Sequence, residues 1–284
     1  MPGVPKGEAA PAKYSLRTVH DVLTSFVSNR KSEGAVLGVL GGMGPAATAD
    51  FYVKLVKATP ATRDQDHIPV VVVGDPRIAD RSHAIETGTE VNVLSGLRKG
   101  LNYLERIGVD AVAMPCNTAH WWLPRLKAET NIPFISLIEA SVRQARRSHP
   151  RGSTALVLGT RATMKWCLYG EELRKADFLP VTLPDSQQEI VNSIIAYVKR
   201  GHIRRAASIF RRSSQNWSYQ ADVVLLACTE LPLAVPTGLK TSPQFIDTTA
   251  ALVDACIDWA KSVSGEGPDQ KPNSECSKSN QNAI

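Results

Sequence analysis

Two segments of the chain each place a cysteine at the end of a short, mostly apolar run. One run, 109–114, leads to Cys116, and the other, 221–227, leads to Cys228. Runs of this length are typical of buried strands. Because ligands of open parallel α/β sheets bind beyond the carboxyl ends of the strands, both thiols are predicted to lie where chemistry occurs. The alternative is that each is a small buried hydrophobe, as free cysteines usually are, but the two matched contexts favour the functional interpretation.

A pair of facing thiols can invert a carbon stereocentre. Inversion needs a base on one face of the carbon acid and an acid on the opposite face. A free thiol titrates near pH ~8.5, and a nearby cation lowers its pKa, so one thiolate and one thiol form a working pair. Asn117, Thr118 and Thr229 can donate to a carboxylate that gains enolate character. Glu230 can accept from a substrate ammonium or help to set the protonation of Cys228.

Two cofactor chemistries are weighed against this interpretation. Zinc is the rival for the cysteines, but neither has the Cys-x-x-Cys or His-x-x-x-His spacing of a zinc site, so no metal is predicted. Residues 42–47 satisfy the dinucleotide pattern G-x-G-x-x-G/A, which needs an acidic residue about twenty positions further on. The acid that ends the second predicted strand, Asp75, comes about thirty residues after the glycines, so a nicotinamide cofactor is not favoured.

The elements that must position these residues alternate between strands and helices. A buried strand at 35–40 leads to a glycine turn at 41–44, and Pro45 suits the first turn of the helix that follows. The free N–H groups of that turn favour a carboxylate or phosphate. Further strands are predicted at 68–73, 109–114, 131–137, 154–158, around Val181 and at 221–227. Further helices are predicted at 90–107, with Val91, Leu94, Leu97, Leu101 and Leu104 at helical spacing, and at 138–148, 187–199 and 203–215.

The fold class predicted from this alternation is α/β, with parallel sheets. Residues 159–164 restate the kind of turn that follows the first strand, which indicates two pseudo-symmetric α/β domains with the active site in the cleft between them. The predicted boundaries are an N-terminal arm at 1–33, a first domain at 34–150 that carries Cys116, a second at 151–262 that carries Cys228, and a disordered tail at 263–284. The last helix of the chain is expected to be able to pack back on the first domain.

Composition narrows the class of protein. A chain of 284 residues with 43% hydrophobic residues can bury a full core. Five cysteines without paired spacing argue against a disulfide framework, and no apolar run is long enough to span a membrane, so a cytoplasmic protein without a membrane partner is expected. The basic residues are scattered apart from two clusters, at 143–151 and 199–212, which are interpreted as solvated helix faces. No nucleic-acid partner is predicted. The net charge of +6 suits an anionic small-molecule substrate.

Three motifs resemble those of the aspartate/glutamate racemase family and occur in the expected order. They are Gly-Gly-Met-Gly at 41–44, Cys-Asn-Thr at 116–118 and Cys-Thr-Glu at 228–230, and the resemblance covers about residues 35–262. The resemblance implies a two-base proton transfer at Cα of an unprotected amino acid, without pyridoxal phosphate or another cofactor. It also implies a two-domain α/β fold that is frequently a homodimer.

Carried onto this chain, the resemblance makes Cys116 and Cys228 the acid/base pair. Arg81 resembles the arginine of the aspartate-racemase loop, and Lys199 resembles the lysine that in some members reaches the second carboxylate. Arg81 belongs to a loop, 74–83, that is dense in ionisable groups, and a guanidinium here could bind a carboxylate in bidentate fashion. The alternative is that the loop lies on the surface and its arginines pair with nearby aspartates. The residues expected to bind the substrate are Met43, Gly44, Arg81, Asn117, Thr118, Lys199, Thr229 and Glu230.

Departures from the family pattern indicate a branch. Glutamate racemases proper carry Asp-Ser-Gly after the first strand and a His after the second Cys-Thr. Gly-Gly-Met-Gly and Glu230 stand at these places, which favours the aspartate or broader amino-acid racemase branch. Both cysteines are present, so interconversion in both directions is expected. The alternatives are an arylmalonate decarboxylase-like or maleate isomerase-like enzyme of the same superfamily, and a catalytically silent carboxylate-binding protein.

Overall fold

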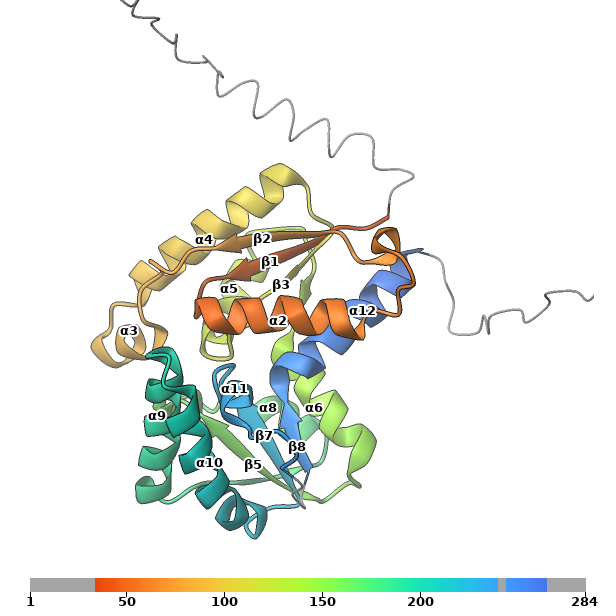
Figure 1. Ribbon diagram of the computed structural model, residues 1–284. Coiled ribbons are helices and arrows are strands. Elements are labelled where there is room, and N and C mark those ends of the chain that lie inside the picture. The colour runs from red at the N-terminus through yellow and green to blue at the C-terminus, as the bar shows by residue number, and fades with distance from the viewer. Residues whose placement is uncertain (1–33, 240–243, 265–284) are drawn as a thin grey trace, which may run out of the picture.

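Two parallel four-stranded sheets, each flanked by helices, make up the protein (Figure 1). The computed structural model describes residues 34–239 and 244–264, so the predicted arm at 1–33 and all but the start of the predicted tail lie outside the described residues. Within those two ranges, no helix has the length and apolar character needed to cross a membrane. The predicted α/β class with two sheets is confirmed.

The first sheet has the strand order β2-β1-β3-β4. Its strands are β1 (Leu37–Gly41), β2 (Val70–Gly74), β3 (Ala111–Ala113) and β4 (Phe134–Ile135). Its helices are α2 (Pro45–Ala58), α3 (Arg81–Thr87), α4 (Glu90–Ile107), α5 (Leu123–Lys127) and α6 (Leu137–Ser148), with short 3-10 turns at η2 (Asp64–Asp66) and η3 (Thr118–Trp122). The central strand β1 is buried along its whole length because helices cover both faces of a parallel sheet.

The second sheet repeats this arrangement, with the strand order β6-β5-β7-β8. Its strands are β5 (Thr154–Gly159), β6 (Leu179–Val181), β7 (Val223–Ala227) and β8 (Gln244–Asp247). Its helices are α7 (Arg161–Lys165), α8 (Gly170–Lys175), α9 (Asp185–Lys199), α10 (Ile203–Ser218), α11 (Leu231–Ala234) and α12 (Thr248–Ser264). Residues 263 and 264, which the sequence assigned to the tail, are the last two residues of α12.

The same close packing follows the first strand of each sheet. A Cβ placed on Gly41 would lie 2.5 Å from Cγ2 of Thr48, and one placed on Gly159 would lie 2.9 Å from Cγ2 of Thr163. Only a glycine lets the end of the strand approach the following helix this closely. The turn at 159–164 therefore restates the first one in its packing as well as in its sequence.

The predicted apolar face of α4 is wrong at one residue, Val91. Val91 is 68% exposed, whereas Val93 is fully buried with Leu94, Leu97, Leu101 and Leu104. An α-helix turns by about 100° per residue, so Val91 lies about 120° from Leu97 around the axis and Val93 only about 40°. Each three-residue step drifts by about 60° around the helix, so the two steps from Leu97 through Leu94 to Val91 leave the buried face.

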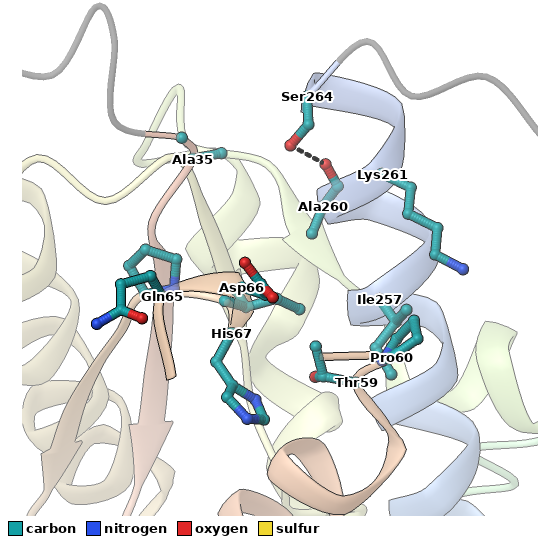
Figure 2. Close-up of a pocket in the computed structure, with 13 residues that line it drawn as sticks. Ala35, Thr59, Pro60, Gln65, Asp66, His67, Ile257, Ala260, Lys261 and Ser264 are labelled. Atoms are coloured by element: carbon teal, nitrogen blue, oxygen red, sulfur yellow. Dashed lines mark hydrogen bonds between the residues drawn. The ribbon is translucent and has the colours of Figure 1, made fainter. Parts of the chain in front are cut away.

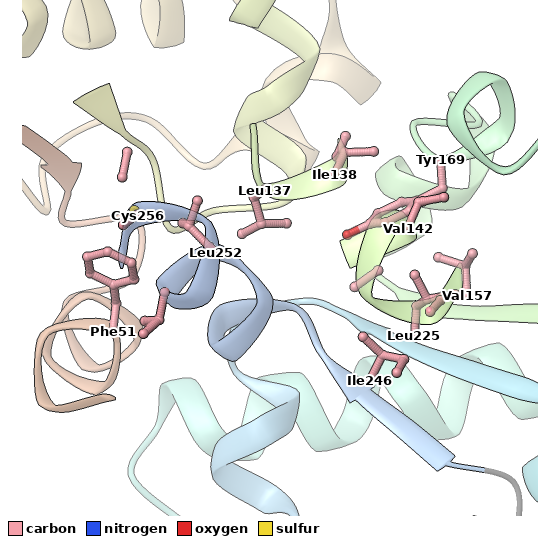
Figure 3. Packing of buried hydrophobic residues seen from close by; sticks show 14 of the residues in the cluster. Phe51, Leu137, Ile138, Val142, Val157, Tyr169, Leu225, Ile246, Leu252 and Cys256 are labelled. Atoms are coloured by element: carbon pink, nitrogen blue, oxygen red, sulfur yellow. The ribbon is translucent and has the colours of Figure 1, made fainter. Parts of the chain in front are cut away.

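One buried cluster joins the two sheets (Figure 3). It contains side chains of β1 and β3 from the first sheet and of β5 and β7 from the second, together with residues of α2, α6 and α12. Helix α12 follows the last strand of the second sheet but packs against α2 and α6 of the first half. Leu252 of α12 and Phe51 of α2 both belong to this cluster (Figure 3). The halves are therefore held by a shared apolar core.

Removing part of this core should destabilise both halves together. Leu252→Ala should lower the free energy of unfolding by about 2–5 kcal/mol, because it leaves a cavity at a fully buried position. Urea denaturation followed by far-UV circular dichroism and by tryptophan fluorescence should show one transition, shifted equally for both probes. Val263→Ala on the same helix, where the side chain is 52% exposed, is the matched control and should change the stability by less than about 0.5 kcal/mol. Two separate transitions in the Leu252 variant would contradict the shared core.

Candidate active site

One pocket is lined by residues from both halves of the molecule. Cys116 follows β3 and Cys228 follows β7, and both thiols line this pocket while being almost fully buried. The lining residues are Met43, Asp80, Arg81, Ser82, Cys116, Asn117 and Thr118 from the first half, and Thr160, Lys199, Cys228, Thr229 and Glu230 from the second. The free volume is about 20 Å³, roughly that of one water molecule, so the lining must separate to admit a larger ligand.

The pocket brings together all but one of the residues expected from the sequence. The exception, Gly44, lies beside it: a Cβ at Gly44 would be 3.1 Å from Oε1 of Glu230. Three lining residues were not expected, namely Asp80, Ser82 and Thr160. Asp80 and Ser82 flank Arg81 in the sequence, and Thr160 belongs to the restated turn, so the sequence held a signal for each.

A larger pocket, of about 230 Å³, lies elsewhere (Figure 2). It is lined by Ala35 before β1, by residues 65–69 before β2 and by the last turns of α12. These are the amino ends of the strands, and none of the residues expected to bind substrate is among its lining residues. The small pocket, at the carboxyl ends, has the position at which α/β sheets bind ligands.

His120 fixes the turn that carries Cys116. Its Nε2 accepts a hydrogen bond from the backbone N–H of Leu137 at 3.0 Å, so the ring proton is on Nδ1, which donates to the carbonyl oxygen of Cys116 at 2.9 Å. Burial lowers the pKa of His120 to about 4, and the ring is therefore neutral at pH 7. The sequence led to no predicted role for His120. The available signal for a role beside Cys116 was the place of His120, four residues further on in an apolar segment.

Arg81 supplies a positive charge beside Cys116. Its Nη2 donates to the carbonyl oxygen of Met43 at 2.9 Å, which holds the guanidinium at the pocket. Its Nε is buried and has no hydrogen-bond partner among the described residues. Burial raises the pKa of the Cys116 thiol, and the positive charge of Arg81 opposes that rise. The second arginine of this loop, Arg77, instead pairs with Asp75 at 2.8 Å on the surface, so both interpretations of the loop apply, each to one arginine.

Cys228 has a negative neighbour. Its Sγ donates a hydrogen bond to Oε2 of Glu230 at 3.0 Å, and Glu230 is itself buried. Burial, and then the negative charge of Glu230, raise the pKa of Cys228 well above its usual value, whereas Lys199 opposes the rise. Cys116 beside a cation is therefore the readier thiolate, and Cys228 beside a carboxylate is the readier proton donor.

An ion pair joins the two halves at the pocket. Nζ of Lys199 lies 3.5 Å from Oδ2 of Asp80. Lys199 ends α9 and Asp80 precedes α3, and these two helices lie on the same side of the molecule (Figure 1). Asp80 also caps α3, because its carboxylate accepts the N–H of His83 at 3.0 Å. Burial lowers the pKa of Lys199, but the negative charges of Glu230 and Asp80 more than offset this, so the net shift is upward and the ammonium stays charged.

The arrangement is suited to proton transfer on a small charged molecule. Two thiols, two cations and two carboxylates line one small space, in which the thiols and Glu230 are almost fully buried while Lys199 and Asp80 are partly exposed to solvent. Nowhere in residues 34–239 and 244–264 do His, Cys, Asp and Glu side chains form a group that could hold a metal ion.

A protein-family profile covers most of the chain, including every residue that lines the pocket. The sequence profile of the Asp/Glu/Hydantoin racemase family matches residues 40–256, a span that includes both cysteines. The chain belongs to this family. The predicted family and the predicted class of enzyme, an isomerase that acts on amino acids, are thereby confirmed.

Individual members of the family are similar over most of their length. The broad-specificity amino-acid racemase RacX of Bacillus subtilis (strain 168) is 29% identical over 229 residues, which span 78% of this chain and 96% of RacX. The structure of the Picrophilus torridus aspartate racemase is 34% identical, with a TM-score of 0.71 over 82% of this chain and 99% of that one. The glutamate racemase isoform RacE1 of Bacillus anthracis, at 18% identity and a TM-score of 0.60 over 82% of this chain and 84% of that one, shares the fold.

The buried His120 should make stability fall with pH below neutrality. The unfolded state takes up a proton near pH ~6.5 and the folded state only near 4, so the stabilisation is complete above about pH 6.5 and is lost progressively as the pH falls towards 4. The loss at the acid end should be about 3 kcal/mol. Urea denaturation at pH 7.0, 5.5 and 4.5 measures this slope.

Two variants test the assignment of that slope. His120→Gln removes the titrating ring and should be less stable at pH 7 but have a flatter dependence on pH. His83→Gln replaces an exposed histidine and should keep the wild-type slope. An unchanged slope in His120→Gln would assign the pH dependence to other groups.

Proposed function

We propose that the protein is an aspartate racemase, or an aspartate/glutamate racemase, that interconverts the L and D forms without a cofactor. The observation that carries the proposal is that Cys116 and Cys228, one from each half, line a single small pocket with charged groups of both signs. A cation beside one thiol and a carboxylate beside the other give the pair the unequal proton affinities that an acid and a base need.

The reaction removes one proton from one face of Cα and adds one proton to the opposite face. The thiolate of Cys116 takes the Cα proton, and the electron pair of the broken C–H bond passes into the α-carboxylate as an enolate. Cys228 then donates its thiol proton to the opposite face of Cα, which forms the new C–H bond and leaves Cys228 as the thiolate. The other enantiomer is converted by the same steps with the two thiols exchanged.

The charged groups suit an acidic amino acid. Arg81 and Lys199 offer two cations for two carboxylates, and Glu230 offers an acceptor for the α-ammonium. Asn117, Thr118 and Thr229 can donate hydrogen bonds to the α-carboxylate as its negative charge grows. The similarity to a broad-specificity amino-acid racemase supports a second candidate, a wider range of amino acids at the same site.

The two cysteines should be essential and the others should not. In D₂O, the wild-type protein should remove the Cα proton signal of L-aspartate and produce D-aspartate, without added pyridoxal phosphate, as followed by proton NMR and chiral chromatography. Cys116→Ala and Cys228→Ala should each lower turnover by at least about 10²–10⁴-fold, the contribution typical of a positioned acid or base.

Cysteines outside the pocket provide the controls. Cys167 is exposed and Cys256 is buried in the shared core, so Cys167→Ala and Cys256→Ala should both keep the wild-type rate. Full activity in either pocket variant would overturn the two-thiol mechanism. A folded wild-type protein that exchanges no amino acid would favour the decarboxylase-like or isomerase-like alternatives, or a silent binding protein.

Lys199 should select for a second carboxylate. Lys199→Met should lower kcat/KM for aspartate by about 10- to 150-fold, the loss expected from about 1.5–3 kcal/mol of a hydrogen bond to a charged group. The value for alanine, which has no second carboxylate, should change by less than about threefold. Steady-state racemisation of both substrates measures this, with Lys57→Met on the exposed side of α2 as the control. Equal losses on both substrates would assign Lys199 to the groups that every amino acid shares.

A further inference from the structure

The side-chain amide of Asn117 is held by a buried chain of hydrogen bonds. The hydroxyl of Tyr169 donates to Oδ1 of Asn117 at 2.5 Å, and Nδ2 of Asn117 donates to Oγ1 of Thr248 at 3.2 Å. Thr248 in turn donates its hydroxyl proton to the carbonyl oxygen of Leu226 at 2.8 Å. The Asn117, Tyr169 and Thr248 side chains are at most 2% exposed, so water does not compete for these bonds.

The two partners of Asn117 select one orientation of its amide. The only proton of the Thr248 hydroxyl goes to Leu226, so this oxygen can act only as an acceptor and must face an N–H group. Tyr169 supplies the donor on the other side. Burial raises the pKa of Tyr169, so the phenol keeps its proton at neutral pH. A flipped amide would place Oδ1 against the lone pairs of Thr248.

This orientation leaves one hydrogen of the amide for the pocket. Nδ2 carries two hydrogens, and within the described parts of the chain Thr248 is the partner of one and the other has none. Asn117 is also a lining residue of the pocket and directly follows Cys116. The remaining N–H is therefore a fixed donor on a residue that lines the pocket.

The groups that fix Asn117 all come from the other half of the molecule. Tyr169 precedes α8, Thr248 begins α12, and Leu226 lies on β7 two residues before Cys228. The chain of bonds therefore connects the residue after one catalytic candidate to the strand that carries the other. The free N–H of Asn117 is therefore oriented only when the two halves pack against each other.

We propose that Tyr169 and Thr248 are positioning residues that aim the free N–H of Asn117 at the α-carboxylate of the substrate. This inference rests on the proposed racemase function. Tyr169 and Thr248 would influence the racemisation only through Asn117. A donor held in place before the reaction stabilises the charge that develops on the carboxylate without having to reorganise. Its loss should therefore affect the transition state more than substrate binding.

Paired substitutions at Thr248 separate this role from packing. Thr248→Val keeps the shape of the side chain but removes the acceptor, and it should lower kcat for both enantiomers of aspartate by about 10- to 100-fold with less than about a threefold change in KM. Thr248→Ser keeps the hydroxyl and should stay within about threefold of wild type. Tyr169→Phe, which removes the donor, should resemble Thr248→Val.

The neighbouring Thr249 provides a matched control. It is also fully buried, but its hydroxyl has no hydrogen-bond partner among the described residues. Thr249→Val should therefore leave kcat and KM unchanged, although it makes the same chemical change at the same depth on the same helix. Thermal unfolding of each variant, followed by circular dichroism, establishes that the compared proteins are folded. Equal losses of kcat in the two valine variants would overturn the positioning role.

A second measurement does not depend on activity. The Nδ2 hydrogens of Asn117 give a pair of signals in a ¹⁵N–¹H spectrum, identified by their absence in Asn117→Asp. Exchange of these hydrogens with solvent should be at least about tenfold faster in Thr248→Val and Tyr169→Phe than in wild type and Thr249→Val, because the bonds that protect them are lost. Wild-type exchange and wild-type kcat in Thr248→Val would overturn the proposal.

The two hypotheses fail in different ways. A folded wild-type protein that racemises no amino acid would contradict the proposed function, and the amide signals would then still support or overturn the fixed orientation of Asn117. An active wild type whose Thr248→Val variant keeps full kcat would leave the racemase function intact. It would remove the positioning role of Tyr169 and Thr248.

Discussion

The shared apolar core sets the distance between the two thiols, and the pocket depends on that distance. Each cysteine belongs to a separate sheet, so neither sheet alone forms a site. Helix α12 leaves the second sheet and packs against the first, which fixes how the two strand ends approach each other. An error of about an ångström in such an approach can cost a factor of about 10² in rate, so the packing of this core bears directly on the proposed reaction.

Burial then decides the charge state of the pocket. It raises the pKa of both thiols, and the neighbours make this rise unequal, because Arg81 opposes it at Cys116 and Glu230 adds to it at Cys228. The pocket has room for about one water molecule, and the two thiols and Glu230 within it are almost fully buried, whereas Lys199 and Asp80 reach solvent. Because the free volume is this small, the lining must separate when a substrate binds. The Asp80–Lys199 ion pair crosses between the halves at this lining.

Much of the fold followed from local patterns. The helix predicted at 90–107 has these bounds in the structure, since its apolar spacing persists for five turns and Gly108 ends it in the left-handed conformation. The strand before Cys116 is shorter than predicted and ends at Ala113, because Pro115 has no N–H group to extend the ladder. Tyr169 had no local signal, because a buried tyrosine looks in sequence like any other core residue, and His120 had only its place four residues after Cys116.

The sequence by itself determined the family, the alternation of strands and helices, and the two cysteines that end matched strands. These properties depend on residue type and on short-range spacing, which a chain carries before it folds. Glu230, two residues from Cys228, was already expected from the sequence to bear on the protonation of that thiol. Only the tertiary structure decided that the two form a hydrogen bond and that Arg81, from a distant loop, lies beside Cys116. It also decided that Asn117 is held by Tyr169 and Thr248, 52 and 131 residues away. The physical reason is that these partners meet only when the core between the sheets closes.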